Sequence, residues 1–278
     1  MSTFPRTTAG GVSVSRMIVG TNWFLGYSHT SLAKDRFIKA YQSRKRIAQV
    51  IGVFLKYGID TVMGPISPLL LDAVRLAEDR AGKKVILVLT PAFSLAPDCH
   101  REDSPEAAFD FCQSHGATFC LPHQCVTDAL IDRRAGVIRN LARFTRMIRE
   151  RGMIPGLSTH MPEAIVYADK QNADVETYIQ PYNSAGFLMQ VEVDWVMKVI
   201  KEAKKPVMTI KPLAAGRILP PVGLAFAWAT LRDCDMVTVG TTTPDEAREV
   251  VELSLGFLER RAPVVALQET RSKKSLRT

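Results

Sequence analysis

Short apolar runs alternate with longer stretches of helical periodicity along nearly the whole chain. Each run is bounded by turn residues, as a buried strand of a parallel sheet is, and the stretch after it has the apolar spacing of a helix that packs on that sheet. We count eight such units. The predicted strands cover residues 17–19, 59–63, 85–89, 117–121, 154–157, 177–180, 207–210 and 236–239.

The stretches between these runs carry helix-start signals. Thr243-Pro244-Asp245-Glu246 is a capping box with proline at the first helical position. The predicted helices begin near Ser31, Ser67, Ser104, Thr127, Met161, Glu192, Leu219 and Thr243. Eight strand–helix units without a glycine-rich nucleotide motif predict the α/β class, as a (β/α)8 TIM barrel, rather than an open doubly wound sheet.

The segments outside the eight units are short. Residues 4–16 predict an N-terminal β-hairpin with Gly10-Gly11 at its turn, and such a hairpin could plug the bottom of the barrel. The predicted barrel domain covers residues 1–262 and is followed by a basic C-terminal tail, residues 263–278. We expect this tail to be mobile and dispensable for folding.

Composition excludes several classes of protein. With 46% hydrophobic and 23% charged residues, a chain of 278 residues can bury a large core. The five cysteines are odd in number and form no CxxC pair, which favours reduced thiols over a disulfide framework or a zinc ribbon. We expect a cytoplasmic protein without a signal peptide or membrane span.

The charge of +8 is uneven along the chain. Much of the excess lies in the tail, and a second basic stretch, residues 133–151, has helical apolar spacing that predicts a solvated helix face. Nucleic-acid binding is not favoured, because no aromatic-rich or helix-turn-helix pattern accompanies the charge. A small-molecule substrate is the expected partner, and no feature specifies an oligomeric state.

Barrel enzymes place their chemistry at the carboxyl ends of the strands, so the residues just after each run are the candidates. They are Asn22, Trp23, Tyr27, His29, Met63, Gly64, Thr90, His123, Gln124, Cys125, Ser158, Thr159, His160, Gln180, Tyr182, Asn183, Lys211, Arg217, Gly240, Thr241 and Thr242. Three of the five histidines are among them. Lys211 is the clearest candidate, because a lysine directly after a buried strand can hold an anion or act as an acid at the barrel mouth.

Six segments carry a family resemblance. They are GGVSVSRMIVGT (10–21), GIDT (58–61), GLS (156–158), QPYN (180–183), KPLAAGR (211–217) and VGTTTPDE (239–246). In this order and spacing they resemble a divergent aldo-keto reductase. That family reduces carbonyls with a nicotinamide cofactor and an Asp-Tyr-Lys-His set, in which the tyrosine is the proton donor.

The chain departs from this set at three of its four positions. Met63 replaces the aspartate, Thr90-Pro91 stands in the place of the lysine, and no tyrosine occurs between Gly58 and Thr90. Only His123 matches. The resemblance therefore implies a cofactor-shaped pocket more firmly than it implies the usual reaction.

The cofactor side is better matched. The resemblance implies cofactor binding by Ser158, Thr159, Gln180, Lys211, Arg217, Gly240, Thr241 and Thr242. Relatives that use NADP carry a lysine and an arginine where this chain has Gly240 and Glu246, so NAD(H) is favoured over NADP(H).

Three hypotheses follow for the function. The first is an oxidoreductase acting on a small carbonyl or alcohol, with His123, Lys211 or Tyr27 as an atypical proton donor. The second is a metal-dependent or acid–base enzyme that uses His29, His123 and His160. The third is a ligand-binding barrel without turnover, which needs no cofactor. Fold alone does not choose among them.

Overall fold

The computed structural model describes residues 3–96, 99–268, 271–274 and 276, and it confirms the predicted (β/α)8 barrel. The parallel strands are β3 (Met17–Gly20), β4 (Thr61–Gly64), β5 (Ile86–Leu89), β6 (Phe119–Cys120), β9 (Ile154–Pro155), β10 (Leu157–Ser158), β11 (Tyr178–Pro181), β12 (Val207–Ile210) and β13 (Met236–Gly240). Their order is β10-β11-β12-β13-β3-β4-β5-β6-β9.

The barrel closes at Gly156, between β9 and β10. These two short strands form one barrel strand, since β9 pairs with β6 on one side and β10 pairs with β11 on the other. A Cβ atom on Gly156 would lie 2.7 Å from the Leu121 side chain and 2.9 Å from the Thr177 carbonyl oxygen. Only glycine permits this approach, so the residue is required where the strand changes partner.

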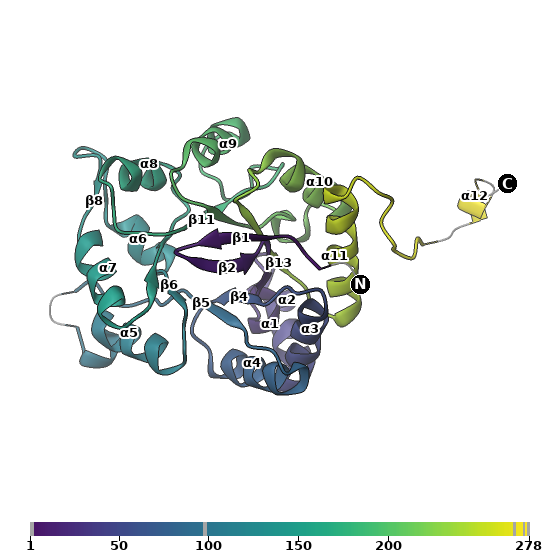
Figure 1. Ribbon diagram of the computed structural model, residues 1–278, viewed down its shortest axis with the longest axis horizontal. Helices are drawn as coiled ribbons and strands as arrows, with labels where there is room; N and C mark the ends of the chain where they lie inside the picture. Colours follow the sequence, from purple (N-terminus) through teal and green to yellow (C-terminus); the bar gives the residue numbers. More distant parts are fainter. Residues whose placement is uncertain (1–2, 97–98, 269–270, 275, 277–278) are drawn as a thin grey trace.

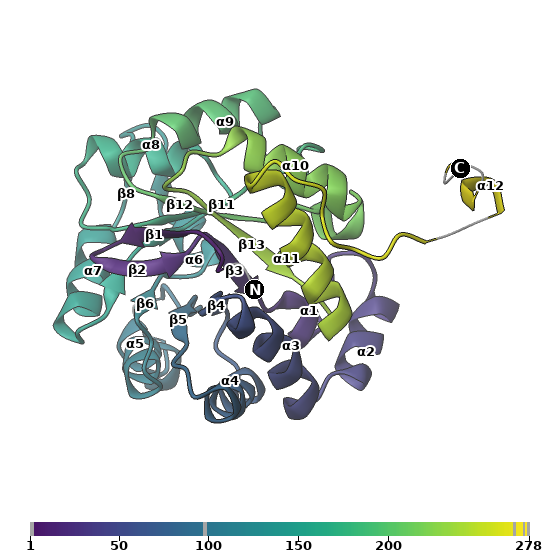
Figure 2. The ribbon, with the colours of Figure 1, turned by 45° about the vertical axis from the view of Figure 1, so that its right-hand side comes forward.

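The helices surround the barrel (Figures 1 and 2). They are α1 (Asn22–Leu25), α2 (Leu32–Tyr41), α3 (Arg44–Lys56), α4 (Pro68–Ala81), η1 (Arg101–Asp103), α5 (Pro105–Ser114), α6 (Gln124–Ala129), α7 (Leu141–Glu150), α8 (Glu163–Lys170), α9 (Val193–Glu202), η2 (Ala214–Gly216), α10 (Pro220–Thr230) and α11 (Pro244–Leu258). At α2, α4, α5 and α11 the predicted Ser or Thr accepts the capping hydrogen bond from a backbone N–H.

The segment after β6 differs from its prediction. The sequence predicts one helix that begins near Thr127 and has a basic face over residues 133–151. The first half of this prediction is wrong. The short α6 is followed by a hairpin of β7 (Ile131–Asp132) and β8 (Val137–Ile138), and α7 begins only at Leu141. Asp132 accepts a hydrogen bond from the Ala135 N–H, and Gly136 has a φ of 66°. These residues form the turn between β7 and β8, so the segment is a hairpin where a helix was predicted.

The predicted N-terminal hairpin is present as β1 (Arg6–Ala9) and β2 (Val12–Ser15). Gly10 and Gly11 form its turn with φ of 53° and 79°. Ala9 and Val14 belong to the barrel's inner cluster, and the hairpin lies across the end of the barrel seen in Figure 1. It therefore closes one end of the barrel.

Two apolar cores flank the barrel wall. The inner cluster comprises Ala9, Val14, Ile18, Met63, Val88, Phe119, Leu121, Ile179, Met208 and Met236. A larger outer cluster lies between the strands and the helices. Because the hairpin fills one end, polar side chains collect at the other end, where the strands have their carboxyl termini.

After α11 the chain first packs on the barrel and then departs from it. A Cβ atom on Gly256 would lie 3.1 Å from the Pro263 Cβ, and Val265 packs against the outer cluster. Farther on, the trace leads away to α12 (Arg271–Lys274), as Figures 1 and 2 show. Part of the predicted tail, residues 269–270, 275 and 277–278, lies outside the described residues. Within the described part of the chain, no helix is long and apolar enough to span a bilayer.

Candidate active site at the barrel mouth

Lys211 is the first residue after β12, in the left-handed conformation with φ of 62°. Its Nζ lies 3.2 Å from Nε2 of His29, and the Asn22 side-chain nitrogen lies 3.3 Å from the same Nε2. The Lys211 ammonium can only donate, so this ring nitrogen accepts its hydrogen bond and the proton of a neutral His29 is on Nδ1. The structure thus brings together the loops after β3 and β12, in which His29 and Lys211 are 182 residues apart.

Burial sets the protonation states of this cluster. It lowers the pKa of Lys211 from 10.5 to about 8. Burial, the Lys211 charge and the two other mouth histidines lower the pKa of His160 to about 4. The pKa values of His29 and His123 are lowered too, first by burial and then by Lys211. At neutral pH the cluster therefore contains three neutral imidazoles around one ammonium group.

His123 is the N-cap residue of α6. Its Nδ1 accepts a hydrogen bond from the Cys125 N–H at 3.3 Å, and the Cys125 thiol lies 3.1 Å from the same nitrogen. This bond assigns the proton of the neutral ring to Nε2. His123 can therefore donate one hydrogen bond from Nε2 without carrying charge.

Arg217 joins two loops at the mouth. Its guanidinium donates to the His29 carbonyl oxygen and to the Ala214 carbonyl oxygen, each at 3.1 Å. The same group lies 4.2 Å from the centre of the Phe187 ring. Arg217 thus holds the His29 loop against the loop after β12 and contributes a second positive charge beside Lys211.

Ser158, Thr159 and Gln180 are buried at the ends of β10 and β11. The Thr159 hydroxyl donates to the Asp128 carboxylate, whose other oxygen accepts from the His160 N–H at 3.2 Å. Burial raises the pKa of Asp128 against the effect of these bonds. Asp128 orients the His160 turn. Sequence reasoning missed it because it follows Thr127, where the sequence predicts the start of a helix and not the end of a strand.

The loop after β13 has its own anion. The Glu246 carboxylate accepts a hydrogen bond from the Thr242 N–H at 2.6 Å, while the Thr243 hydroxyl accepts from the Glu246 N–H. Arg248 pairs with Asp245 at 2.8 Å. The positive end of the α11 dipole is therefore already compensated by the carboxylate of Glu246, a residue of the helix itself.

Trp23 lies against this loop. A Cβ atom on Gly240 would be 3.1 Å from the Trp23 ring, and one on Gly216 would be 3.9 Å from it. The indole therefore borders both the end of β13 and the loop after β12. Among the described residues, neither the buried Thr241 hydroxyl nor the buried side-chain oxygen of Gln180 has a hydrogen-bond partner.

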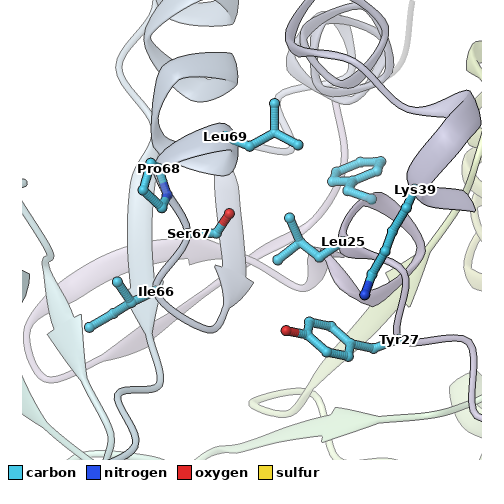
Figure 3. A pocket seen from close by; sticks show the side chains of 8 residues that line it. Leu25, Tyr27, Lys39, Ile66, Ser67, Pro68 and Leu69 are labelled. Carbon is cyan, nitrogen blue, oxygen red and sulfur yellow. The ribbon is translucent and has the colours of Figure 1, made fainter. Parts of the chain in front are cut away.

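Tyr27 lies apart from these contacts. It lines a cavity of about 320 Å³. The other lining residues are Phe24, Leu25, Lys39, Ile66, Ser67, Pro68 and Leu69. Figure 3 shows the Tyr27 ring and Lys39 on one side of the cavity, with Ser67 and Pro68 on the other. Half of Tyr27 is exposed, and none of the three mouth histidines lines this cavity.

The described residues do not provide the set of metal ligands that the metal-dependent hypothesis needs. Among them, no group of three or more His, Cys, Asp or Glu side chains has a geometry that could hold a metal ion. His29, His123 and His160 thus share the mouth without forming such a group.

The sequence and the structure of this barrel were compared with those of known proteins. No protein-family model matches the chain, and no curated protein sequence does. Solved structures do match: an aldo-keto reductase from Brucella melitensis has 13% identity and a TM-score of 0.58, with 91% of this chain and 93% of that chain covered.

Two aldo-keto reductase structures from Klebsiella pneumoniae are also similar. One, in complex with NADPH, has 13% identity and a TM-score of 0.56 and covers 99% of this chain and 94% of its own. The other, with NADP and acetate, has 14% identity and the same TM-score of 0.56, with 100% and 95% covered. The chain thus has the fold of the aldo-keto reductases, as the sequence resemblance implied.

Proposed function

We propose that the protein is a nicotinamide-dependent oxidoreductase of the aldo-keto reductase type, which reduces a small carbonyl compound with Lys211 as the proton donor. The observation that carries this proposal is the Lys211 ammonium, largely buried at the barrel mouth and 3.2 Å from a neutral histidine. The fold adds support, because similar barrels are aldo-keto reductases.

The residues of the mouth fit a nicotinamide group. The Gln180 side-chain oxygen and the Thr241 hydroxyl are buried polar atoms without a partner, as expected where a polar ligand supplies the missing bond. Ser158, Gln180 and Thr241 would hold the cofactor, with Arg217 near its charged part. A bound reduced nicotinamide supplies a hydride to the carbonyl carbon.

The chain's own residues supply the proton. Lys211 holds it on Nζ below pH 8 and delivers it to the carbonyl oxygen. His29 keeps the ammonium in place by accepting its hydrogen bond. The Nε2–H of His123 donates to the same substrate oxygen and thereby orients it. Because His123 is neutral, it adds no positive charge that would lower the pKa of Lys211 further and reduce the population of its ammonium form.

We further propose NAD(H) rather than NADP(H) as the cofactor. The extra phosphate of NADP would meet the negatively charged Glu246 carboxylate, which already accepts the hydrogen bond of the Thr242 N–H. Arg248 faces Asp245, so it does not compensate. Two like charges in this position disfavour binding by about 1 kcal/mol even with solvent screening.

The first experiment is a pair of fluorescence titrations with NADH and NADPH at one ionic strength. We expect NADH to bind about five-fold more tightly. Glu246→Gln should narrow this difference, whereas Glu249→Gln, an exposed residue of the same helix, should leave it unchanged. Tighter binding of NADPH would contradict the cofactor assignment, and no binding of either would contradict the proposed function.

A further inference from the structure

We propose that Lys211 also forms a covalent imine with small aldehydes and ketones, which gives the barrel mouth an activity beyond carbonyl reduction. The inference does not rest on the proposed reduction, because it needs only the lysine, its neighbours and a carbonyl compound.

The surroundings of Lys211 differ from those of an ordinary lysine. Among the described residues, no carboxylate forms an ion pair with it, and its Nζ lies 3.2 Å from Nε2 of the His29 imidazole. By contrast, Lys205 pairs with Glu176 at 3.3 Å. A carboxylate holds a lysine in its charged form, which has no lone pair and cannot attack a carbon. The environment of Lys211 lacks that restraint.

Position adds a second argument. Lys211 starts the loop after β12, on a barrel whose opposite end is closed by the hairpin, so its amine faces the open end. The residue keeps intermediate exposure, which leaves a path for a small molecule. Burial also increases the neutral fraction of the amine at pH 7 from about 0.03% to about 10%.

The neighbouring groups match the proton transfers of imine formation. The Lys211 lone pair attacks the carbonyl carbon, and the carbonyl oxygen takes a proton from Nε2 of His123 or from water. His29 accepts the proton that the nitrogen loses. The hydroxyl group then takes a proton and leaves as water while the nitrogen forms the double bond. The net change is carbonyl plus amine plus one proton to iminium plus water, without an oxidant or reductant.

The two roles of Lys211 use different forms of the same amine. The charged form can donate a proton to a carbonyl oxygen, and the neutral form can add to a carbonyl carbon. The iminium ion draws electrons from its neighbouring carbon, so a C–H bond there can release its proton to a nearby neutral histidine. The substrate class is therefore a small carbonyl compound with a C–H bond next to the carbonyl carbon.

Borohydride trapping tests the proposal on the full chain without any nicotinamide. The protein is incubated at pH 7.5 with pyruvate or glyceraldehyde and then with sodium borohydride, which reduces an iminium to a stable secondary amine. We expect intact mass to show one dominant adduct and peptide mapping to place it on Lys211, with at least about 10-fold more label there than on Lys205.

The controls are Lys211→Arg, which should lose the dominant adduct, and Lys205→Arg, which should keep it. Labelling spread over surface lysines, or no adduct with either probe, would overturn the proposal. Peptide mapping of the wild-type protein decides the matter even if Lys211→Arg does not fold. Because the trapping contains no NAD(H), its failure is separate from failure of the proposed reduction.

Discussion

Met63 and Thr90 are both buried at the carboxyl ends of β4 and β5, where the aldo-keto reductase resemblance implies an aspartate and a lysine. Met63 packs into the inner apolar cluster, and the Thr238 hydroxyl lies 3.9 Å from its sulfur. A buried aspartate or lysine without its oppositely charged partner is strongly destabilising. When one of the two is replaced by an uncharged residue, we therefore expect the other to be replaced as well. In the proposed reduction, the proton donor therefore comes from elsewhere in the mouth.

His123 should be the most sensitive histidine in catalysis. Its Nε2–H is free to donate because Nδ1 is bound to the Cys125 N–H. We expect His123→Ala to lower the rate of NADH-dependent carbonyl reduction by about 100- to 1,000-fold, as is usual when one hydrogen-bond donor to the reacting oxygen is removed. His100→Ala, at an exposed site beside η1, is the matched control. A folded His123→Ala protein with full turnover would reject the assigned role.

Asp128 shows what residue-level sequence reasoning misses. Its neighbours in sequence give no sign that its carboxylate holds the His160 turn, whereas the capping box did mark Glu246, which accepts from the Thr242 N–H. Asp128 bonds to residues about 30 positions away. By contrast, Lys211 could be predicted because its place directly after a strand fixes the end of the barrel at which it lies.

At the scale of elements, the Gly156 junction makes a direct prediction about stability. Gly156→Ala should lower the free energy of unfolding by about 2 kcal/mol or more, because the new Cβ would lie 2.7 Å from Leu121 and 2.9 Å from a backbone oxygen. Gly52→Ala, in α3 with no heavy atom within 4 Å of the new Cβ, should instead raise it by about 0.5–1 kcal/mol.

Urea denaturation of both glycine variants measures the two effects. If Gly156→Ala were as stable as the wild-type protein, the barrel strand would not pass as closely to Leu121 and Thr177 as the structure shows.

The elements that could be predicted have strong local signals. Buried apolar runs identified each barrel strand, and Ser-Pro or Thr-Pro pairs marked the starts of α4, α5 and α11. The hairpin β7–β8 could not be predicted in this way, because its turn is rich in arginine and looks like a helix surface. Gly136 was the remaining signal, and a single glycine is tolerated in helices.

At the scale of the whole molecule, the boundary of the barrel domain is open to test. Truncation after Ala262 removes Pro263 and Val265, which contact α11 and the outer cluster. We expect that variant to lose a few degrees of melting temperature. Truncation after Leu267, which is exposed, should change it by less than about 1 °C. If the two truncated proteins had equal melting temperatures, the result would support the domain boundary at residue 262 that the sequence predicts.

The closed barrel explains why the site could be predicted only in outline. Eight parallel strands bring their ends to one mouth, so the strand-end residues were expected to gather there. Which of them touch depends on side-chain directions. His29, Lys211 and Arg217 meet, whereas Tyr27 turns to a separate cavity. The hydrophobic periodicity of the sequence gives no information on which of these side chains are in contact.

The pH dependence of NADH oxidation with small carbonyl compounds tests the central role of Lys211 most directly. In the proposed reaction the charged form of Lys211 is the donor, and burial lowers the pKa of this amine to about 8. The rate should therefore be constant at lower pH and fall ten-fold per unit above pH 8. Lys211→Arg keeps the charge but cannot release its proton, so it should lose at least about 100-fold at every pH. A flat wild-type profile from pH 6 to 10, together with an active Lys211→Arg protein, would contradict the account.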